Sequence, residues 1–555
     1  MPFFQAPPEL GNQYVDDDML RRYVRHALPP DVFTHVEPEL LAAGELSGGE
    51  LYRQLLSEER HDEPRLISWD AWGHRIDRVE VSALWKKAAA IAAEKGLIAT
   101  AYEKKNAEFS RIHQFALLYV LEASLGVYSC PLAMSDGAAK TLLVSKNDVL
   151  AARALPRLLS RDPALVWTSG QWMTERTGGS DVAISETIAK PDGDAFLLYG
   201  TKWFTSAAAS EMTVTLARPE GNPPGGAGLA LFYLETRKPD GTMNGIQVNR
   251  LKDKLGTRMV PTAELLLDGA RAFPILGTRD GVRNITPMLH ITRTWNSVCA
   301  VSGMRRALAL AKDYARRRVV FGAKLADKPL HADTLAGMEA EYEGAFLLAF
   351  RAAELLGKDE AGVMNEHEAA LLRLMLPITK LLTAKQAVAI ASETLEAFGG
   401  AGYIEDTGLP RLLRDAQVLP IWEGTTNVLS LDVLRVLAKG GTLAPIAAEV
   451  RAAVENAPAD LGGVAAEVVR AVTHAEAWFE KAKHGGPDVT EAGARRLAMT
   501  LGRALEVAFL VRLARLASKE NDHVKPAAAA RRMTMHGIDL IVDDVVSADR
   551  ETLAR

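Results

Sequence analysis

Apolar residues recur at two different spacings along this chain, and the change of spacing divides it into regions. Over residues 1–160 they recur every three or four positions, as in LWKKAAAIAAEKGLIATAYEKK and HQFALLYVLEASLGVYSC, which predicts amphipathic helices. No run of alternating apolar and polar residues interrupts this pattern. The first region is therefore predicted to be a helical N-terminal domain.

The pattern changes to short β-rich runs over residues 161–284, such as AFLLYGTKWFT, MTVTLARP, GLALFYLE and AELLLDGA. Turn signals separate these runs at residues 191–193, 223–226 and 239–241, where proline presets φ and glycine accepts a positive φ. This region is predicted to be a middle β domain of short antiparallel strands.

Helical spacing returns at about residue 285 and continues to the end of the chain. Residues 285–440 are predicted to form a bundle of long helices, and the alanine-rich residues 441–555 an additional helical domain, with Lys439-Gly440-Gly441 between them. The apolar positions that carry the bundle prediction are Val298, Val301, Met304, Leu308, Ala311, Leu335, Met338, Tyr342 and Phe346.

The composition describes a globular protein of several domains. The chain has 555 residues, of which 48% are hydrophobic and 24% charged, which is too much apolar material for disorder and too long a chain for one core. Its 65 basic and 70 acidic residues leave a net charge of −5, so no general field attracts nucleic acid or an anionic membrane. The N-terminus lacks a signal-peptide pattern, and no apolar run has the ~18 residues of a membrane span. We therefore expect a cytoplasmic protein that does not contact a membrane.

The two cysteines, Cys130 and Cys299, are too few for a disulfide framework or a cysteine-rich metal site. We expect both to be small buried side chains, and the sequence predicts no metal site.

Two strings near the start of the β region contain residues suited to a flavin. WTSGQWMTERTGGSDVA carries two adjacent glycines followed by a hydroxyl, so its backbone could approach and bind a bulky anionic group such as a pyrophosphate. In YGTKWFTSA, Trp203 and Thr205 alternate on a strand and could hold an isoalloxazine edge. The alternatives are a Gly-Gly-Ser-Asp turn between strands and a tryptophan of the core.

The helical half contains further candidates. The three arginines of YARRRVVFG end a predicted helix and could bind a phosphate, or could be a solvated helix terminus. Glu423 lies between Trp422 and Gly424-Thr425-Thr426, where a threonine can cap a helix that begins near Asn427. Burial against Trp422 would raise the pKa of this carboxyl and the helix N-terminus would lower it, whereas a surface glutamate would have neither influence.

The order of these motifs resembles the acyl-CoA dehydrogenase family over about residues 80–440. The shared strings are T-E-x-x-G-G-S-D, W-F-T, R-x-x-F-G, F-G-G-x-G-Y and W-E-G-T. The N-terminal PPELGNQYVDDDMLRRYV, the internal RHDEPRLISWDAWGHRIDRVEV and the extra C-terminal helices resemble its AidB-type, alkylation-response branch. The resemblance implies a mainly α fold with a middle β-barrel domain, a helical N-terminal domain, a four-helix bundle and an additional helical domain.

The resemblance also implies FAD as cofactor and Glu423 as the catalytic base. Met173 and Thr174 would lie near the flavin ring, and Arg318 would reach the FAD diphosphate of a neighbouring subunit. Ser180 and Gly424 would contact the substrate. The full set implied to bind FAD is Gln171, Met173, Thr174, Gly179, Ser180, Trp203, Phe204, Thr205, Ser206, Arg318, Phe321, Gly399, Gly400, Ile421, Trp422, Thr425, Thr426 and Asn427.

Three positions depart from the usual family pattern. Arg176 stands where many members have proline, and Asn427 stands where many have glutamine. Pro329 stands where many have a flavin-binding glutamine, so that contact is not expected here.

The function implied is α,β-dehydrogenation of an acyl-CoA in fatty acid metabolism. The implied partners are an electron acceptor such as an electron-transfer flavoprotein and further copies of the chain in a homotetramer. Two alternatives remain: a DNA-associated, AidB-like flavoprotein with weak dehydrogenase activity, and an acyl-CoA-binding flavoprotein without turnover.

Charge argues against the DNA-associated alternative. Residues 441–555 contain 15 basic and 16 acidic residues, whereas neutralising phosphates requires a positive excess. The possible arginine stripe, interrupted by Glu491 and Glu506, is predicted to be a solvated helix face; its members are Arg495, Arg496, Arg503, Arg512 and Arg515.

Overall fold

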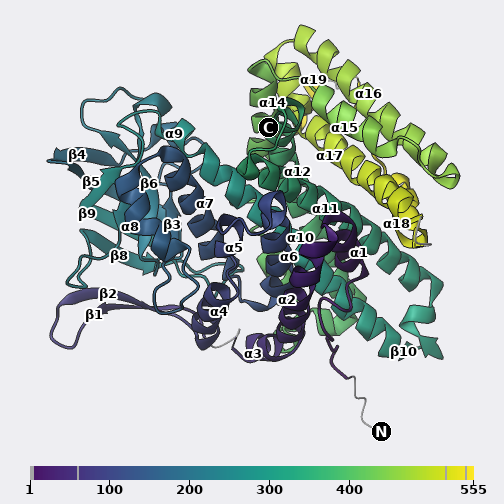
Figure 1. The fold of residues 1–555 in the computed structure, drawn as a ribbon, viewed down its shortest axis with the longest axis horizontal. Helices are drawn as coiled ribbons and strands as arrows, with labels where there is room; N and C mark the ends of the chain where they lie inside the picture. The colour runs from purple at the N-terminus through teal and green to yellow at the C-terminus, as the bar shows by residue number, and fades with distance from the viewer. Residues whose placement is uncertain (1–5, 59–61, 519–521, 544–546, 555) are drawn as a thin grey trace. The chain divides into compact units, whose positions relative to one another are not determined.

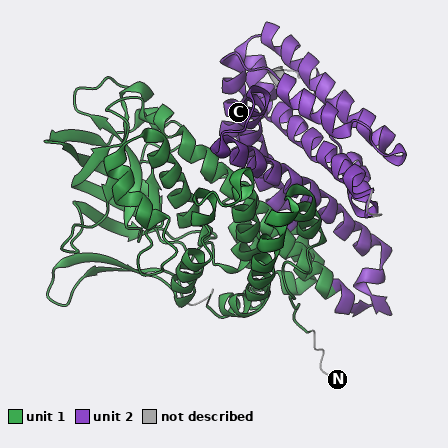
Figure 2. Cartoon of the chain, in the orientation of Figure 1, with its two compact units in different colours: residues 1–314, 391–423 green, residues 315–390, 424–555 purple. Residues whose placement is uncertain are grey.

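The computed structural model describes residues 6–58, 62–518, 522–543 and 547–554. The chain forms two compact units, residues 1–314 with 391–423 and residues 315–390 with 424–555 (Figure 2). It passes from one unit to the other within two long helices, α10 (Thr286–Arg317) and α12 (Glu366–Ala397), and again after Glu423.

The first unit begins with helices that precede and follow a β-hairpin (Figure 1). Several begin at a polar cap predicted by local chemistry, such as Asp17 before α1 and Ser82 before α4, whose side chains accept a backbone N–H of the first turn. The helices are α1 (Asp18–Ala27), α2 (Pro30–Gly48), α3 (Glu50–Glu58), α4 (Ala83–Glu94), α5 (Ala99–Tyr102), α6 (Ser110–Leu121), α7 (Ser129–Ser145) and α8 (Asp148–Leu158).

The hairpin of β1 (Arg65–Trp69) and β2 (Arg75–Glu80) corrects the prediction that this region is helical throughout. Its turn is fixed locally, because the Asp70 side chain accepts hydrogen bonds from two backbone N–H groups of the turn and Gly73 adopts a φ of +84°. Each strand is only five or six residues long, so its alternation is too short to stand out in the sequence.

The β region forms a seven-stranded sheet that closes on itself. The strand order is β3-β6-β4-β5-β9-β7, β8 pairs with β9, and β7 also pairs with β6, which completes the ring. Its strands are β3 (Ser169–Trp172), β4 (Ile188–Asp192), β5 (Ala195–Ser206), β6 (Met212–Pro219), β7 (Ala230–Glu235), β8 (Ile246–Leu251) and β9 (Thr262–Pro274).

The middle sheet is not antiparallel throughout, as was predicted. Strand β6 runs parallel to β3 and to β4. This is possible because β3 and β6 are far apart in the chain, with β4 and β5 between them, so a crossover can connect them. Strands β5 and β9 are also longer than expected, at 12 and 13 residues, and bulges in their pairing let them bend around the ring.

A buried carboxylate fixes α10 within the first unit. Asp136 of α7 is fully buried and accepts hydrogen bonds from Trp295 of α10 at 2.7 Å and from Arg111 at 2.6 Å. Gln114 and Tyr102 donate to the same carboxylate at 2.8 and 2.6 Å. Because the donors come from three helices, α5, α6 and α10, this network sets the position of α10, which carries part of the candidate site.

The second unit is helical apart from a two-strand hairpin. It contains the end of α10 and most of α12. Its remaining elements are β10 (Val319–Val320), β11 (Ala323–Lys324), α11 (Pro329–Ala361), α14 (Thr426–Ala438), α15 (Ala444–Val454), α16 (Gly462–His484), α17 (Pro487–Ala517), α18 (Val524–Met535) and α19 (Ser547–Ala554). The apolar positions predicted for the bundle are buried, those from Val298 to Ala311 in α10 and those from Leu335 to Phe346 in α11.

The solvated arginine face predicted for the C-terminal region is present only in part, because Arg495 is exposed while Arg503 is buried and the other arginines of the stripe are half-buried. Helix α17 packs against α11, α14, α15, α16 and α18, so most of its surface is covered. Arg503 is buried and pairs with Glu341 of α11 at 3.0 Å, and Arg512 pairs with Glu449 at 3.4 Å. Glu506 is also fully buried.

Helix α12 is long and apolar enough to cross a bilayer by length and composition, alone among the helices of the described residues. However, 83% of its most apolar window is buried inside the protein, which is typical of a core helix.

Candidate active site

Glu423 lies in the turn between α13 (Pro410–Ala416) and α14. Its backbone is left-handed, with φ of +56°, and Gly424 follows with φ of +100°. A left-handed glutamate is uncommon and costs free energy, so the surrounding contacts must hold it in place. Thr425 then caps α14 by accepting the N–H of Val428, as the sequence predicted.

Helix α10 holds Glu423 and the tryptophan before it from one face. Thr292 donates a hydrogen bond to the Glu423 carboxylate, Oγ1 to Oε2, at 2.6 Å, and the Arg293 guanidinium lies 3.4 Å from the Glu423 carbonyl oxygen. One helical turn later, Asn296 accepts a hydrogen bond from the Trp422 indole N–H. Because residues four apart share a helix face, a single rigid element sets the direction of the carboxylate.

The glycine-containing loop after β3 is anchored by a buried ion pair. Glu175 Oε1 lies 2.7 Å from Lys202 Nζ of β5, and both side chains are buried. Burial alone would raise the pKa of Glu175, but Lys202 and the donors from Thr187 and Glu186 hold that pKa below its usual value. The loop is thus fixed at Glu175, while the residues that follow it are exposed.

Gly179 explains why this loop needs glycine. A Cβ on Gly179 would approach Thr174 Oγ1 to 2.6 Å, so a larger residue would push the two apart. Gly178 has φ of +113° and open space around it, and its N–H closes a turn on the Glu175 carbonyl at 3.0 Å. This turn spans Glu175–Gly178, ahead of the Gly178–Asp181 turn that was predicted as the alternative to a flavin-binding loop.

The end of β5 departs from regular strand geometry at the W-F-T string. Phe204 has φ of +51°, a bulge lies between Lys202 and Thr205 in the pairing with β9, and the Phe204 side chain is 60% exposed. The Lys252 ammonium lies 3.6 Å above the Trp203 ring, so this tryptophan is partly covered by a cation and is not a core residue.

The two hydroxyl residues that end β5 are held by the neighbouring strand. Thr205 is buried and donates to the Ala263 carbonyl at 2.6 Å, and Ser206 Oγ lies 3.1 Å from Thr262 Oγ1. The Ser206 hydroxyl also hydrogen-bonds the thiol of Cys130.

Cys130 links the strand edge to the glutamate. Burial raises the pKa of the Cys130 thiol to about 12; the Glu423 carboxylate adds to this rise, and the Lys254 ammonium opposes it. Cys130 is buried as predicted, whereas Cys299 is only partly buried. The Ser206 hydroxyl and the Glu423 carboxylate thus both influence the same thiol, so these two sequence-predicted residues belong to one region of the first unit.

The remaining predicted residues of the first unit differ in their exposure. Gly399 and Gly400, in the short 3₁₀ turn Gly399–Gly402, are exposed, and a Cβ on either would meet no atom within 4 Å. Ile421 is 61% exposed. Gln171 and Met173 are half-buried, and the side-chain amide oxygen of Gln171, Oε1, is buried without a hydrogen-bond partner among the described residues.

Other predicted residues belong to the second unit. Arg318 begins the β10–β11 hairpin and its carbonyl accepts the Leu325 N–H at 2.8 Å; Phe321, at the turn, is 96% exposed. Gly424 accepts a hydrogen bond from buried Lys380 at 2.6 Å, and Pro329 is the first residue of α11. The last predicted residues, Thr426 and Asn427, start α14.

Sequence reasoning missed the residues that hold Glu423. Thr292 and Asn296 are polar positions four apart in α10, and they stand among other polar residues such as Arg293 and Thr294, so their spacing alone did not single them out. Cys130, Lys254 and Thr262 carry no motif of their own, so nothing in the sequence separated them from structural residues.

Comparison with known proteins assigns the family. Residues 5–163 match the adaptive response protein AidB N-terminal domain, residues 170–270 the acyl-CoA dehydrogenase middle domain, and residues 279–438 the acyl-CoA dehydrogenase C-terminal domain. Together these models match most of the chain.

Two curated relatives agree with these matches. The chain is 50% identical to acyl-CoA dehydrogenase family member 11 of Caenorhabditis elegans, over 79% of this chain and 72% of that protein. It is 33% identical to the putative acyl-CoA dehydrogenase AidB of Escherichia coli, over 68% of this chain and 69% of that protein.

A solved structure shares the fold over nearly the whole chain. The crystal structure of Caenorhabditis elegans ACDH-11 in complex with C11-CoA has a TM-score of 0.95 and 43% identity, covering 99% of this chain and 96% of that one. The protein belongs to the acyl-CoA dehydrogenase family, with an AidB-type N-terminal domain, and is an oxidoreductase of that class.

Proposed function

We propose that the protein is an FAD-dependent acyl-CoA dehydrogenase in which Glu423 removes the α-proton of an acyl-CoA thioester. The observation that carries this proposal is the Thr292–Glu423 hydrogen bond of 2.6 Å, which aims a carboxylate from a left-handed turn. A catalytic base needs a carboxylate held in a fixed direction and a site nearby for the hydride acceptor. Strained backbone is typical of residues with such a role.

The residues present fit a flavin. Gly179 lies where a Cβ would strike Thr174, the side-chain amide oxygen of Gln171 is buried without a partner among the described residues, and Phe204 is exposed at a bulge. We infer that Gln171, Met173, Thr174, Gly179 and Ser180 of the loop hold FAD together with Trp203, Phe204, Thr205 and Ser206 of β5. When bound, FAD would supply the hydride acceptor.

The glutamate and its neighbours have separate tasks in this reaction. Glu423 takes the proton from the carbon next to the thioester carbonyl, while Thr292 keeps the carboxylate pointing toward that carbon. The backbone N–H of Glu423 would bind the thioester oxygen, where negative charge develops. Trp422, fixed by Asn296, excludes water from the carboxylate.

The substrate class is acyl-CoA, and the role is fatty acid metabolism in the cytoplasm. Similarity to a relative solved with C11-CoA supports an acyl-CoA of medium chain length. An electron-transfer flavoprotein is the expected electron acceptor. Arg318, Phe321, Gly399, Gly400, Thr425, Thr426 and Asn427 would complete the FAD site within a homotetramer, with Ser180 and Gly424 contacting the substrate.

The experiment that tests this proposal measures turnover with a panel of saturated acyl-CoAs. The purified protein should be yellow, with one non-covalent FAD per chain, and should reduce an artificial electron acceptor with at least one acyl-CoA. Protein that cannot be loaded with FAD would contradict the proposal. Binding of acyl-CoA without flavin bleaching would instead establish a non-catalytic binding protein.

A further inference from the structure

Lys254 is a half-buried lysine in the loop between β8 and β9 that the proposed reaction does not use. Its ammonium donates three hydrogen bonds, to the carbonyl oxygens of Thr257 and Val260 at 2.7 Å each and to Thr262 Oγ1 at 3.0 Å. All three ammonium protons therefore have acceptors, and all three acceptors are neutral.

The charge on Lys254 is not neutralised by a direct partner. Within the part of the chain that the structure describes, no carboxylate lies at ion-pairing distance from the Lys254 nitrogen, and the charged groups that influence it are Asp415, Glu63 and Arg258. Lys252, two residues earlier, differs in this respect, since it pairs with Glu264 at 2.5 Å. Burial lowers the pKa of Lys254 to about 8, so the ammonium is mostly charged at pH 7.

Two hydroxyl groups lie between this ammonium and the end of β5. Thr262 Oγ1, which accepts from Lys254, lies 3.1 Å from Ser206 Oγ, and the two residues pair across β9 and β5. An ammonium can only donate, so Thr262 must direct its oxygen toward Lys254 and its proton away. The Thr262 proton has two acceptors within reach, the Val260 carbonyl oxygen at 3.5 Å and Ser206 Oγ at 3.1 Å. It is therefore the Lys254 charge that places positive potential at the Ser206 edge.

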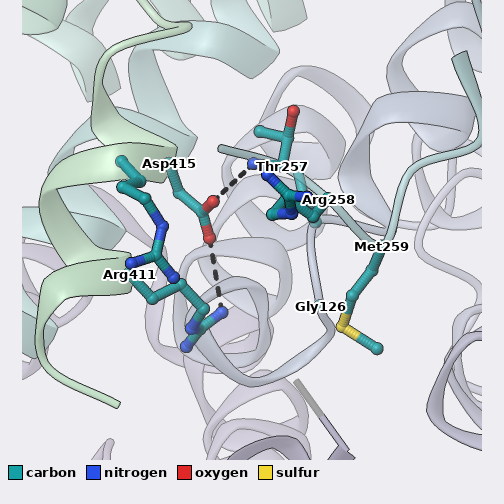
Figure 3. Close-up of a pocket in the computed structure, with 8 residues that line it drawn as sticks. Gly126, Thr257, Arg258, Met259, Arg411 and Asp415 are labelled. Atoms are coloured by element: carbon teal, nitrogen blue, oxygen red, sulfur yellow. Dashed lines mark hydrogen bonds and ion pairs between the residues drawn. The ribbon is translucent and has the colours of Figure 1, made fainter. Parts of the chain in front are cut away.

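The loop that carries Lys254 is fixed by a close contact with α13. Thr257 has φ of +50°, and its N–H donates to Asp415 Oδ1 at 2.6 Å, as seen in Figure 3. A Cβ on Gly256 would lie 2.2 Å from the Arg414 carbonyl oxygen, so only glycine lets the loop approach the helix so closely. Lys254 is therefore held in one position, which a lysine at the surface would not be.

We propose that Lys254 is a positioning and charge-setting residue that raises the reduction potential of the bound flavin, acting through Thr262 and Ser206. This inference rests on the proposed function, because it takes Ser206 to lie at the flavin edge. Negative charge accumulates on the flavin as it is reduced, so a fixed, half-buried positive charge behind that edge favours the reduced form.

The test is a reductive titration of the FAD-loaded, full-length protein against a reference dye, with no acyl-CoA present. Lys254→Met should lower the equilibrium constant for flavin reduction by about tenfold, which corresponds to about 30 mV for a two-electron couple. Lys254→Arg should stay near the wild-type value, and Thr262→Val, which keeps the charge and removes one hydroxyl, should fall between. The matched control is Lys238→Met, an exposed lysine in the turn after β7.

An unchanged potential in Lys254→Met, with normal FAD content, would overturn the inference. If that variant does not fold or load FAD, the wild type decides: its potential should fall more steeply with pH above about pH 8, where the ammonium loses its proton. A slope that does not change there would also overturn it. A shifted potential in a protein that no acyl-CoA reduces would leave this inference standing and refute the proposed function.

Discussion

The direction of the Glu423 carboxylate depends on one hydroxyl of α10. Thr292→Val keeps the side-chain shape and removes the 2.6 Å hydrogen bond, so the carboxylate should lose its fixed direction. We expect the rate of flavin reduction by acyl-CoA to fall by about tenfold to a hundredfold, since small displacements of a reacting group have effects of this size. Stopped-flow absorbance under anaerobic conditions measures it.

Thr294→Val is the matched control for this prediction. Thr294 is a buried threonine of the same helix whose hydroxyl donates only to the His290 carbonyl one turn earlier. If both variants slow the reaction equally while retaining FAD, the Thr292–Glu423 contact does not position the base.

At the scale of single residues, the sequence predicted the residues that lie in recognisable motifs. It missed the residues that contact those motifs only in the folded protein. Glu423 and the Thr174–Ser180 loop stand in strings recognisable by order and spacing. Thr292 and Lys254 act through distances that only folding creates, since Glu423 lies 131 positions from Thr292 in the chain. A helix pattern shows which face is apolar, and it does not show which polar residue faces a distant turn.

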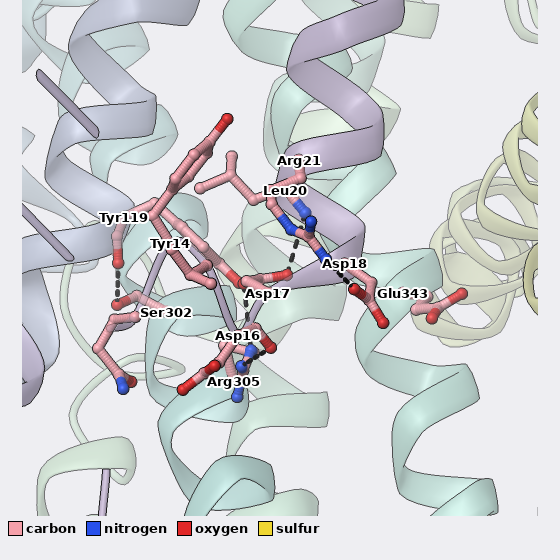
Figure 4. Close-up of polar contacts among 12 residues, drawn as sticks. Tyr14, Asp16, Asp17, Asp18, Leu20, Arg21, Tyr119, Ser302, Arg305 and Glu343 are labelled. Carbon is pink, nitrogen blue, oxygen red and sulfur yellow. Dashed lines mark hydrogen bonds and ion pairs between the residues drawn. The ribbon is translucent and has the colours of Figure 1, made fainter. Parts of the chain in front are cut away.

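A buried carboxylate attaches α1 to the rest of the first unit. Asp17 caps α1, accepts the Tyr119 hydroxyl of α6 at 2.5 Å, and pairs with Arg305 of α10 at 3.1 Å (Figure 4). Asp17→Ala should destabilise the protein by about 3 kcal/mol, because it leaves buried donors without their acceptor. Chemical denaturation measures the change.

The neighbouring residue Asp18 provides the comparison for Asp17. Asp18 is exposed and pairs only with Arg21 in the same helix, so Asp18→Ala should cost less than about 1 kcal/mol. Equal effects of the two substitutions would show that the Asp17 contacts add nothing to ordinary helix capping.

The short 3₁₀ turn Glu122–Ser124 after α6 makes stability depend on pH. Burial raises the pKa of Glu122 to about 7, against opposing hydrogen bonds from Ser129 and Cys299. Because the pKa of Glu122 is raised in the folded state, its contribution to the free energy of unfolding is complete below about pH 4.5 and is lost as the pH rises through 7.

Glu122→Gln removes this titration while keeping an acceptor for Ser129, which donates to Oε1 at 2.7 Å. The free energy of unfolding of the wild type relative to this variant should therefore fall by about 3 kcal/mol between pH 4.5 and pH 7, and then level off. Thermal or denaturant unfolding at several pH values measures it. A difference that does not vary with pH would show that Glu122 titrates normally.

The elements themselves were largely predictable, with instructive exceptions. Long helices such as α10 and α11 repeat their apolar spacing over many turns, so their existence was clear. The β1–β2 hairpin and the parallel pairings of β6 were missed, because the first depends on one Asp70 turn and the second on which strands meet after folding.

The whole molecule carries too little free positive charge for tight DNA binding. The C-terminal residues 441–555 have a net charge of −1, and Arg503 and Arg512 are turned toward Glu341 and Glu449. We expect weak, salt-sensitive binding to double-stranded DNA in a mobility-shift assay. Submicromolar affinity at physiological salt, lost on deleting these residues, would contradict this expectation.

Fold class and family were accessible from the sequence because they rest on many weak signals in one order along the chain. The buried charges of α17 were not, because a helix covered on all sides by other helices has no apolar stripe to identify its packing. Arg503 and Arg512 pair with glutamates of neighbouring helices, Glu341 and Glu449, and composition alone cannot distinguish this arrangement from a solvated face.

The most direct test of the account is anaerobic flavin reduction by an acyl-CoA in wild-type protein and in Glu423→Gln. The amide keeps the shape and can still accept the Thr292 hydrogen bond, so fold, FAD content and acyl-CoA binding should be retained. The rate of bleaching should fall by about 10² to 10⁴, the usual contribution of a general base. Bleaching of Glu423→Gln at the wild-type rate would show that another group is the base or that the reaction is not α,β-dehydrogenation.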